Sequence, residues 1–263
     1  MDYFSSVVTD PPHHIDFMGA TWDSRKGGPA FQAKFWSKVL RVLKTGHYLV
    51  AKGNGHTYHR IVCAIEDAGF VIDDLLVRLN GNNNPKSKRK LKNDNEPICL
   101  AYKPQSPIAL QIEACRIPAQ DESYREKCAS VVGSRSNDSG ACYGAWTQPR
   151  SDSFSEAGRW PANVVCDEEA AEQLREVSKF FYCPRVSAAE RGQLKHPTMT
   201  PVALTRWLVR LITPLGGVVL DPFAGSGSFG VGVGAKLEGF GFIGIEKDKA
   251  NYLEAQGRLL CAA

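Results

Sequence analysis

The chain has 263 residues, of which 43% are hydrophobic and 23% charged, a balance typical of a folded globular protein. Its formal net charge of +4 is too small to indicate a nucleic-acid partner by itself. No run approaches the roughly 20 apolar residues of a membrane span, and the N-terminus does not resemble a signal peptide. The eight cysteines are scattered without a Cys-x-x-Cys pair, which argues against a zinc site or a disulfide framework. We therefore expect a cytoplasmic protein with no membrane partner and no bound metal.

The first part of the chain alternates between strand-like and helix-like patterns. Strands are predicted at 4–9, 47–52, 70–79 and 97–103, and helices at 30–44 and 57–68. Gly46 and Gly69 follow the two helices, at the position where glycine commonly ends a helix. Alternation of this kind predicts a mostly parallel sheet with helices on both faces.

The middle of the chain is polar and irregular. A loop at 80–95 carries five basic residues, namely Lys86, Lys88, Arg89, Lys90 and Lys92. This loop either binds nucleic-acid phosphates or is simply a solvated loop. Between 104 and 195 the periodicity fades, apart from a helix predicted at 167–177 and a strand at 179–183, so this region is predicted to be an inserted segment.

Regular alternation resumes near residue 200. Thr200 is expected to cap a helix that begins at Pro201 and runs to Thr213. Strands at 218–221 and 240–246 follow, separated by a glycine-rich turn into a helix, and a last helix is predicted at 248–260.

The glycine-rich turn has the spacing of a nucleotide-binding loop. Gly225, Gly227 and Gly230 form a G-x-G-x-x-G pattern after a strand, and Glu246 ends the next strand. Such glycines let the backbone approach a ligand, and the acidic residue can accept hydrogen bonds from ribose hydroxyls. Too little chain follows Glu246 to supply the remaining strands of a dinucleotide-binding fold. The N-terminal strands must therefore complete the sheet, and this loop shares a crevice with the strand that ends at Asp10.

That first strand runs into the sequence TDPPHH at residues 9–14, which has three interpretations. It is an ordinary polar turn, a metal site built from His13, His14 and Asp16, or a pocket for a flat base.

TDPPHH at 9–14 and HPTMTPVALTRWLVRLITPLGGVVLDPFAGSGS at 196–228 together resemble the β-class DNA amino-methyltransferases of bacteria and phages. In that class a D-P-P-[YFW] motif comes first, a target-recognition region next, and H-P-T-x-K-P and D-P-F-x-G-S-G last. The resemblance covers most of the chain outside about 104–158. It implies a doubly wound, circularly permuted Rossmann-like fold, built from a catalytic part at 1–103 and a cofactor-binding part at 196–263, with a target-recognition insertion at 104–195.

The resemblance also implies an activity, which is transfer of a methyl group from S-adenosylmethionine to the exocyclic amine of a base flipped out of double-stranded DNA. Adenine N6 is favoured over cytosine N4, because cytosine enzymes of this kind more often begin the motif with Ser. The implied catalytic residues are Asp10, Pro11, Pro12 and His13. The implied cofactor-binding residues are Thr9, Asp10, His196, Pro197, Thr198, Asp221, Pro222, Phe223, Gly225, Ser226, Gly227 and Glu246. We expect DNA phosphates to bind to the basic loop. We also expect the protein to be a monomer or homodimer in a bacterial cell or phage-infected host.

Three departures from the family pattern keep other functions open. His13 stands where the family usually has an aromatic residue, and Thr200 where it usually has Lys. The chain also begins directly on its first strand, without the preceding Gly-Asp step of relatives, which predicts weak cofactor binding. A DNA-binding protein that keeps the fold but has lost catalysis is the main alternative. Methylation of RNA or protein fits the Asp-Pro-Pro motif but fits the basic loop and insertion less well, and the pattern does not indicate whether a restriction partner exists.

Overall fold

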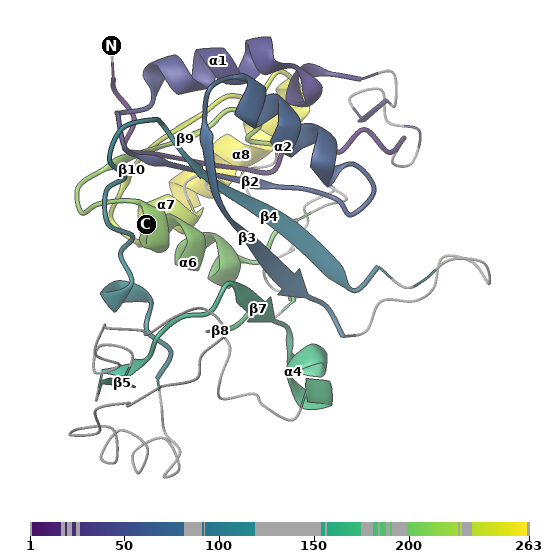
Figure 1. Ribbon diagram of the computed structural model, residues 1–263. Helices are drawn as coiled ribbons and strands as arrows, with labels where there is room; N and C mark the ends of the chain where they lie inside the picture. The colour runs from purple at the N-terminus through teal and green to yellow at the C-terminus, as the bar shows by residue number, and fades with distance from the viewer. Residues whose placement is uncertain are drawn as a thin grey trace, which may run out of the picture.

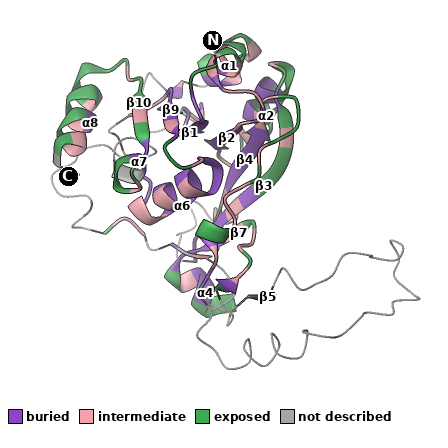
Figure 2. Ribbon diagram, turned by 90° about the vertical axis from the view of Figure 1, so that its left-hand side faces the viewer, coloured by how far each residue is buried: buried purple, intermediate pink, exposed green. Residues whose placement is uncertain are grey.

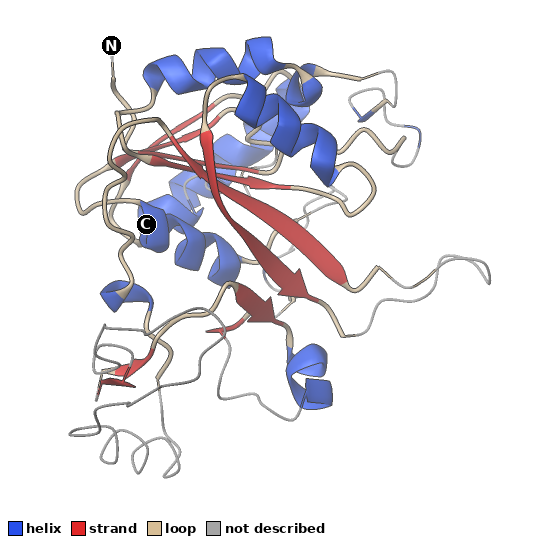
Figure 3. Ribbon diagram, viewed as in Figure 1, coloured by secondary structure: helices blue, strands red, loops and turns tan. Residues whose placement is uncertain are grey.

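The structure is a computed structural model, drawn in Figure 1. It describes residues 2–16, 19, 23–24, 27–81, 91, 93–118, 154–155, 157–174, 181–183, 185–187, 190, 199–225, 227 and 233–261. Within these ranges one twisted sheet lies between two layers of helices (Figure 3), which confirms the predicted α/β class. No helix of the described ranges is long and apolar enough to cross a bilayer.

The main sheet has eight strands in the order β10-β9-β1-β2-β4-β3-β7-β8. Their bounds are β1 (Ser6–Thr9), β2 (Tyr48–Lys52), β3 (Val71–Leu79), β4 (Asn95–Tyr102), β7 (Val164–Cys166), β8 (Phe181–Tyr182), β9 (Val218–Asp221) and β10 (Gly241–Gly244). Every neighbouring pair is parallel except the two that include β4, which is antiparallel to β2 and β3. The strands predicted from the sequence are therefore present, and β7 and β8 add two strands from the 104–195 region to the same sheet.

Helices cover both faces of this sheet. The first layer contains α1 (Ala33–Val42) and α2 (Tyr58–Asp67), with a short 3-10 turn, η3 (Pro29–Phe31), before α1. The second contains α6 (Val202–Ile212), α7 (Val233–Leu237) and α8 (Lys249–Cys261). The smaller elements are η4 (Glu113–Cys115), α4 (Glu168–Leu174) and a separate hairpin of β5 (Phe154–Ser155) and β6 (Gly158–Arg159).

The core follows from apolar strands that are covered on both faces. Side chains alternate along β1, so Val7 packs with the α1 and α2 layer and Val8 with the α6 layer. On α6, Leu204, Leu208 and Ile212 repeat every four residues and form the buried stripe of that helix. Figure 2 shows this arrangement as buried strands at the centre and exposed surface on the outer helices.

Two helix starts differ from the sequence predictions. The helix predicted at 30–44 is interrupted at Gln32, whose extended backbone (φ −116°, ψ 118°) separates η3 from α1. The predicted cap at Thr200 is wrong, because the N-cap of α6 is Pro201 and makes no side-chain capping bond. The Thr200 hydroxyl instead hydrogen-bonds Lys52 and Asp10.

The connectivity brings the first and last parts of the chain together. β1, β2, β9 and β10 are parallel, so their carboxyl ends lie along one edge of the sheet. β1 lies between β2, which follows it in sequence, and β9, which comes from the other end of the chain. Ligands of open α/β sheets bind at such a switch point, outside the carboxyl ends of the strands. Asp10 directly follows β1 and Asp221 ends β9, so both carboxylates lie at this place.

Truncating the buried stripe of α6 tests this packing. Leu208 is fully buried, and Leu208→Ala is expected to lower the free energy of unfolding by about 3 kcal/mol through lost burial and the cavity left behind. Leu215→Ala is the matched control, because Leu215 is 94% exposed and its loss should change the same quantity by less than about 0.5 kcal/mol. Urea unfolding followed by circular dichroism measures both. Equal losses in the two variants would contradict the packing of α6 against the sheet.

Candidate active site

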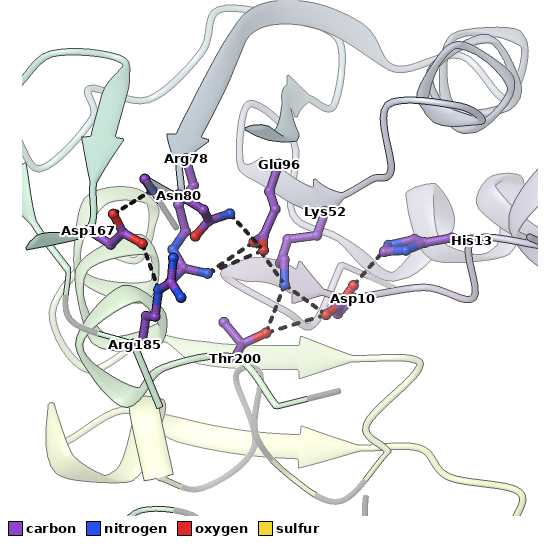
Figure 4. Close-up of polar contacts among 10 residues, drawn as sticks. Asp10, His13, Lys52, Arg78, Asn80, Glu96, Asp167, Arg185 and Thr200 are labelled. Carbon is purple, nitrogen blue, oxygen red and sulfur yellow. Dashed lines mark hydrogen bonds and ion pairs between the residues drawn. The ribbon is translucent and has the colours of Figure 1, made fainter. Parts of the chain in front are cut away.

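Asp10 is the centre of a polar cluster at the carboxyl ends of the strands (Figure 4). Its Oδ2 accepts hydrogen bonds from Lys52 Nζ at 3.0 Å and from the Thr200 hydroxyl at 3.3 Å. Its Oδ1 lies 3.2 Å from Nε2 of His13. Burial favours a raised pKa for Asp10, but the nearby Lys52 ammonium and the His13 ring outweigh it, so the pKa lies well below its usual range. Asp10 is therefore an ionised carboxylate that can only accept hydrogen bonds.

Lys52, the last residue of β2, is a buried cation with acidic neighbours on both sides. Its Nζ lies 2.9 Å from the Thr200 hydroxyl, on the same side as Asp10, and 3.7 Å from Oε2 of Glu96. Burial favours the neutral amine, yet the charges of Asp10 and Glu96 raise the pKa of Lys52 above its usual value. The lysine therefore stays charged while only 8% of its side chain is exposed.

The cluster continues onto the next two strands of the sheet. Glu96 on β4 is the cross-strand partner of Arg78 on β3, and the Arg78 guanidinium donates to both carboxylate oxygens of Glu96 at 3.2 and 3.3 Å. The Asn80 side-chain amide donates to Oε1 of Glu96 at 3.2 Å. Charges thus alternate along the row Asp10, Lys52, Glu96 and Arg78, which Figure 4 shows crossing the sheet.

The two histidines form a defined turn. Both backbone N–H groups after His13, those of His14 and Ile15, donate to the Asp23 carboxylate at 2.6 and 3.1 Å. The His14 ring is buried, with Nδ1 3.0 Å from the Ser24 carbonyl oxygen. The His13 carbonyl accepts a hydrogen bond from the Thr57 hydroxyl. Within the described residues no group of three metal-ligating side chains gathers, so the hypothesis of a metal site at His13, His14 and Asp16 has no geometric support.

Asp221 is the second buried carboxyl group of the crevice. Its Oδ1 accepts hydrogen bonds from the Thr9 hydroxyl at 2.7 Å and from the Phe223 N–H at 3.1 Å. Its Oδ2 is buried and has no hydrogen-bond partner among the described residues. Burial raises the pKa of Asp221 well above its usual value, and the negative charges of Asp10 and Glu246 act in the same direction. An unpaired buried oxygen of this kind is a place for a ligand group that donates hydrogen bonds or carries positive charge.

Glu246 holds the glycine loop against the end of β10. Its two carboxylate oxygens accept hydrogen bonds from the backbone N–H groups of Gly225 and Asp248, at 2.8 and 2.7 Å. Gly225 and Gly227 have φ angles of 55° and 77°, a left-handed backbone that favours glycine and leaves the loop without side chains at those points. Glu246 therefore has a structural contact in addition to the ribose contact that the sequence suggested.

A further buried carboxylate, Asp167, joins the inserted region to the sheet. Its Oδ1 accepts from the N–H groups of Gly81, after β3, and Ala170, in the first turn of α4. Its Oδ2 accepts from Nε of Arg185 at 2.8 Å. Burial opposes ionisation, but these donors lower the pKa of Asp167 below its usual value.

Comparison with known proteins identifies the chain at the level of its family. The N6/N4 methyltransferase family model, described as DNA methylase, matches residues 4–256. The chain belongs to this family. A curated relative, the type II methyltransferase M2.MboI of Moraxella bovis, is 37% identical over 75 residues. That match covers 28% of this chain and 26% of the relative, so the chain spans about a quarter of the length of this curated relative in the match.

Solved structures of DNA methylases share the fold. The M1.HpyAVI–SAM complex (SAM is S-adenosylmethionine) has a TM-score of 0.55 at 18% identity, covering 98% of this chain and 90% of that one. The putative DNA modification methylase TTHA0409 of Thermus thermophilus, also complexed with S-adenosylmethionine, gives 0.52 at 19% identity over 100% and 88% of the two chains. The cytosine-N4-specific PvuII DNA methyltransferase gives 0.55 at 16% identity over 98% and 79%. These likenesses confirm the Rossmann-like methyltransferase fold.

The residues predicted for the site divide into two groups. Most are described, and the structure brings them to the switch point: Thr9, Asp10, Pro11, Pro12, His13, Asp221, Pro222, Phe223, Gly225, Gly227 and Glu246. Phe223 also packs its ring against Phe35, with 4.7 Å between centroids. The remaining predicted residues lie outside the described ranges: His196, Pro197, Thr198, Ser226, Lys86, Lys88, Arg89, Lys90 and Lys92.

Several residues of the site were not singled out from the sequence, among them Lys52, Arg78, Asn80 and Glu96 of the cluster and Asp23 of the turn after β1. Lys52 could have been found from its place at the end of an apolar strand. A lysine is seldom buried without a partner, so this position indicates a nearby acidic group. The same signal applies to Arg78, near the end of the strand predicted at 70–79. Asp23 gave no such signal, since its contact depends on the path of the loop after β1.

Proposed function

We propose that the chain is an S-adenosylmethionine-dependent DNA methyltransferase that acts on the exocyclic amine of a flipped base. The observation that carries the proposal is an ionised Asp10 at the switch point, beside the buried Asp221 and the glycine loop. An exocyclic amine is a poor nucleophile because its lone pair is delocalised into the ring. A fixed acceptor that aligns this nitrogen contributes through positioning more than through base strength.

The residues of the crevice fit the cofactor. The unpaired Oδ2 of Asp221 suits a ligand with positive charge, and the open backbone at Gly225 and Gly227 allows close approach. We assign Thr9, Asp10, Asp221, Pro222, Phe223, Gly225, Gly227 and Glu246 to cofactor binding, together with His196, Pro197, Thr198 and Ser226 outside the described ranges. When bound, the cofactor supplies a methyl group on a positively charged sulfur.

The target amine fits the other side of Asp10. Its Oδ2 is occupied by Lys52 and Thr200, whereas Oδ1 faces the His13 ring. Each carboxylate oxygen has two acceptor directions, so Oδ1 accepts one N–H and the Pro11 carbonyl the second. The half-buried His13 ring offers a flat surface for the base at this point.

The finer assignments extend this proposal. Adenine N6 is favoured over cytosine N4, on the ground that the motif begins with Asp10 and not with Ser. Double-stranded DNA is the partner, with its phosphates on the loop that carries Lys86, Lys88, Arg89, Lys90 and Lys92, and residues 104–195 read the target sequence. We expect a monomer or homodimer in the cytoplasm of a bacterial cell or an infected host.

Transfer of a labelled methyl group to unmethylated DNA tests the activity. We expect incorporation by the wild-type chain and none by Asp10→Ala, and digestion of the DNA should yield N6-methyladenine. N4-methylcytosine as the product would retain the activity and reject the adenine assignment. If wild type and Asp10→Ala both bind DNA but transfer nothing, the chain is a DNA-binding protein with the methyltransferase fold. Incorporation into RNA or protein in place of DNA would reject the substrate class.

A further inference from the structure

We propose that Lys52 is a positioning residue for the methyl-transfer reaction: its ammonium holds Oδ2 of Asp10 and so presents Oδ1 to the target amine. The inference rests on the proposed function, which supplies the reaction and the amine. It concerns a residue that lies in neither TDPPHH at 9–14 nor the motif stretch at 196–228.

The contacts of Lys52 place its charge between the two carboxylates. Nζ lies 3.0 Å from Asp10 Oδ2 and 3.7 Å from Glu96 Oε2. It also donates to the Thr200 hydroxyl at 2.9 Å, and Thr200 itself donates to the same Oδ2. Lys52 is the last residue of β2, a strand that is buried along its whole length, so the backbone from which the ammonium extends is fixed.

Two donors on one oxygen fix the plane of the carboxylate. The terminal torsion of an aspartate side chain has a broad energy minimum, so a carboxylate without such contacts turns readily. Lys52 and Thr200 hold Oδ2 from the side of the sheet, and Oδ1 then points toward His13. The contacts on Oδ2 therefore determine that Oδ1 is the oxygen that faces the base. Positioning of this kind is worth most where a reacting nitrogen must be aligned with a methyl group.

Lys52 also keeps Asp10 an acceptor. The polar and charged groups near Asp10 come from five elements. These groups are His13 after β1, Lys52 on β2, Glu96 on β4, Thr200 before α6 and Asp221 on β9. Burial favours protonation of Asp10, while Lys52 and His13 oppose it and keep its pKa below the usual range. The charge of Asp10 in turn raises the pKa of Asp221 and acts in the same direction on Glu96. A protonated Asp10 would carry an O–H donor in the place where the amine needs an acceptor. Without Lys52, the pKa of Asp10 therefore rises, and Asp10 becomes protonated at a higher pH.

Thr200 provides a second position from which a cation can reach Asp10. Its hydroxyl is within hydrogen-bond distance of both Lys52 Nζ and Asp10 Oδ2. A lysine at position 200 therefore starts beside the space that the Lys52 ammonium occupies. If Lys52 acts through its charge on Asp10, the variant Lys52→Met should be rescued by Thr200→Lys.

Steady-state methyl transfer by Lys52→Met tests the inference. At pH 6 we expect kcat to fall by about 100-fold, the scale of a misplaced reacting group, with little change in the KM for S-adenosylmethionine. The part of the loss that comes from protonation of Asp10 should shrink as the pH rises, whereas the part that comes from a turned carboxylate should remain. Lys52→Met/Thr200→Lys should recover most of the rate. Lys103→Met is the matched control, because Lys103 pairs with Asp2 and lies beside the His47 and Leu43 backbone at the opposite edge of the sheet.

A second measurement follows the protonation of Asp10 directly and does not depend on methyl transfer. The carboxyl carbon of Asp10, labelled with ¹³C and assigned with Asp10→Asn, is followed by NMR from pH 4 to 9. Wild type should show no titration in this range, and Lys52→Met should show a step. Should Lys52→Met fold poorly, Lys52→Met/Glu96→Gln removes the buried ammonium together with its partly buried Glu96 partner, and is tested in the same way.

The outcomes separate the inference from the function on which it rests. If Lys52→Met keeps the wild-type kcat and the wild-type dependence of kcat on pH, the inference is overturned. A loss that Thr200→Lys does not restore in any part, which is the signature of a merely structural lysine, would also overturn it. If the wild type transfers no methyl group, the proposed function fails, and the carboxyl titration alone decides whether Lys52 controls Asp10.

Discussion

Asp10→Asn is expected to lower the rate of methyl transfer by about 1,000-fold, because the variant loses the hydrogen-bond acceptor that aligns the target amine. Asparagine has the shape of aspartate but one oxygen fewer. Lys52 has only donors, so it orients the new amide with its oxygen toward itself and its NH₂ group toward the base. A donor then faces the donor N–H of the target amine. The variant thus removes the acceptor while keeping the volume, which Asp10→Ala does not.

Initial rates with labelled S-adenosylmethionine measure this effect, and thermal unfolding and DNA binding check that the variant is folded. Asp2→Asn is the matched control, since Asp2 is an exposed aspartate that pairs with Lys103. We expect the control to keep the wild-type rate. A loss below tenfold in Asp10→Asn would mean that the Asp10 carboxylate is not the acceptor for the amine.

The sequence was sufficient for most of the fold because burial on two faces leaves a clear pattern. β1 and β2 are buried at every position, and short apolar runs between amphipathic helices predicted them. The sequence analysis did not predict that β4 runs antiparallel to its neighbours. In the structure β4 pairs antiparallel with β3, the strand that precedes it in the sequence, an arrangement that needs no crossover connection.

The predicted part of the site lies on motifs that are continuous in the sequence. Asp10 sits in TDPPHH and Asp221 in DPFAGSG, and each motif follows a strand, so both were placed at the strand ends. Their approach is a consequence of the parallel pairing of β1 with β9. Proximity across more than 200 residues was therefore predictable from topology alone.

The charged row behind Asp10 was not predictable in the same way. Lys52 and Glu96 are the single charged residues of β2 and β4, whereas Arg78 shares β3 with Asp73 and Asp74. Their pairing depends on the register, in which Arg78 is opposite Glu96 and Lys52 is opposite Ile98. Because a shift of one residue turns a side chain to the other face, only the observed register brings the three charges together.

This row makes a second prediction, which concerns stability. Arg78→Met is expected to lower the free energy of unfolding by about 3 kcal/mol, the lower end of the range for breaking a buried ion pair. Arg78 is 5% exposed and donates to both oxygens of Glu96. The loss stays at the lower end because Lys52 and Asn80 still contact Glu96. Arg206→Met is the control: Arg206 pairs with Glu238 but is 42% exposed, so its loss should cost less than about 1 kcal/mol.

Urea unfolding of the two variants decides between a buried network and a set of independent contacts. The row contains two carboxylates and two cations, so Arg78→Met leaves one negative charge without a counterpart. Adding Glu96→Gln removes that charge and should restore part of the stability, since neutralising both partners avoids the uncompensated ion. If Arg78→Met costs no more than Arg206→Met, the network does not act as a unit. A recovery in the double variant would instead show that charge balance across the row, and not the Arg78 side chain alone, stabilises the strands that carry Asp10 and Lys52.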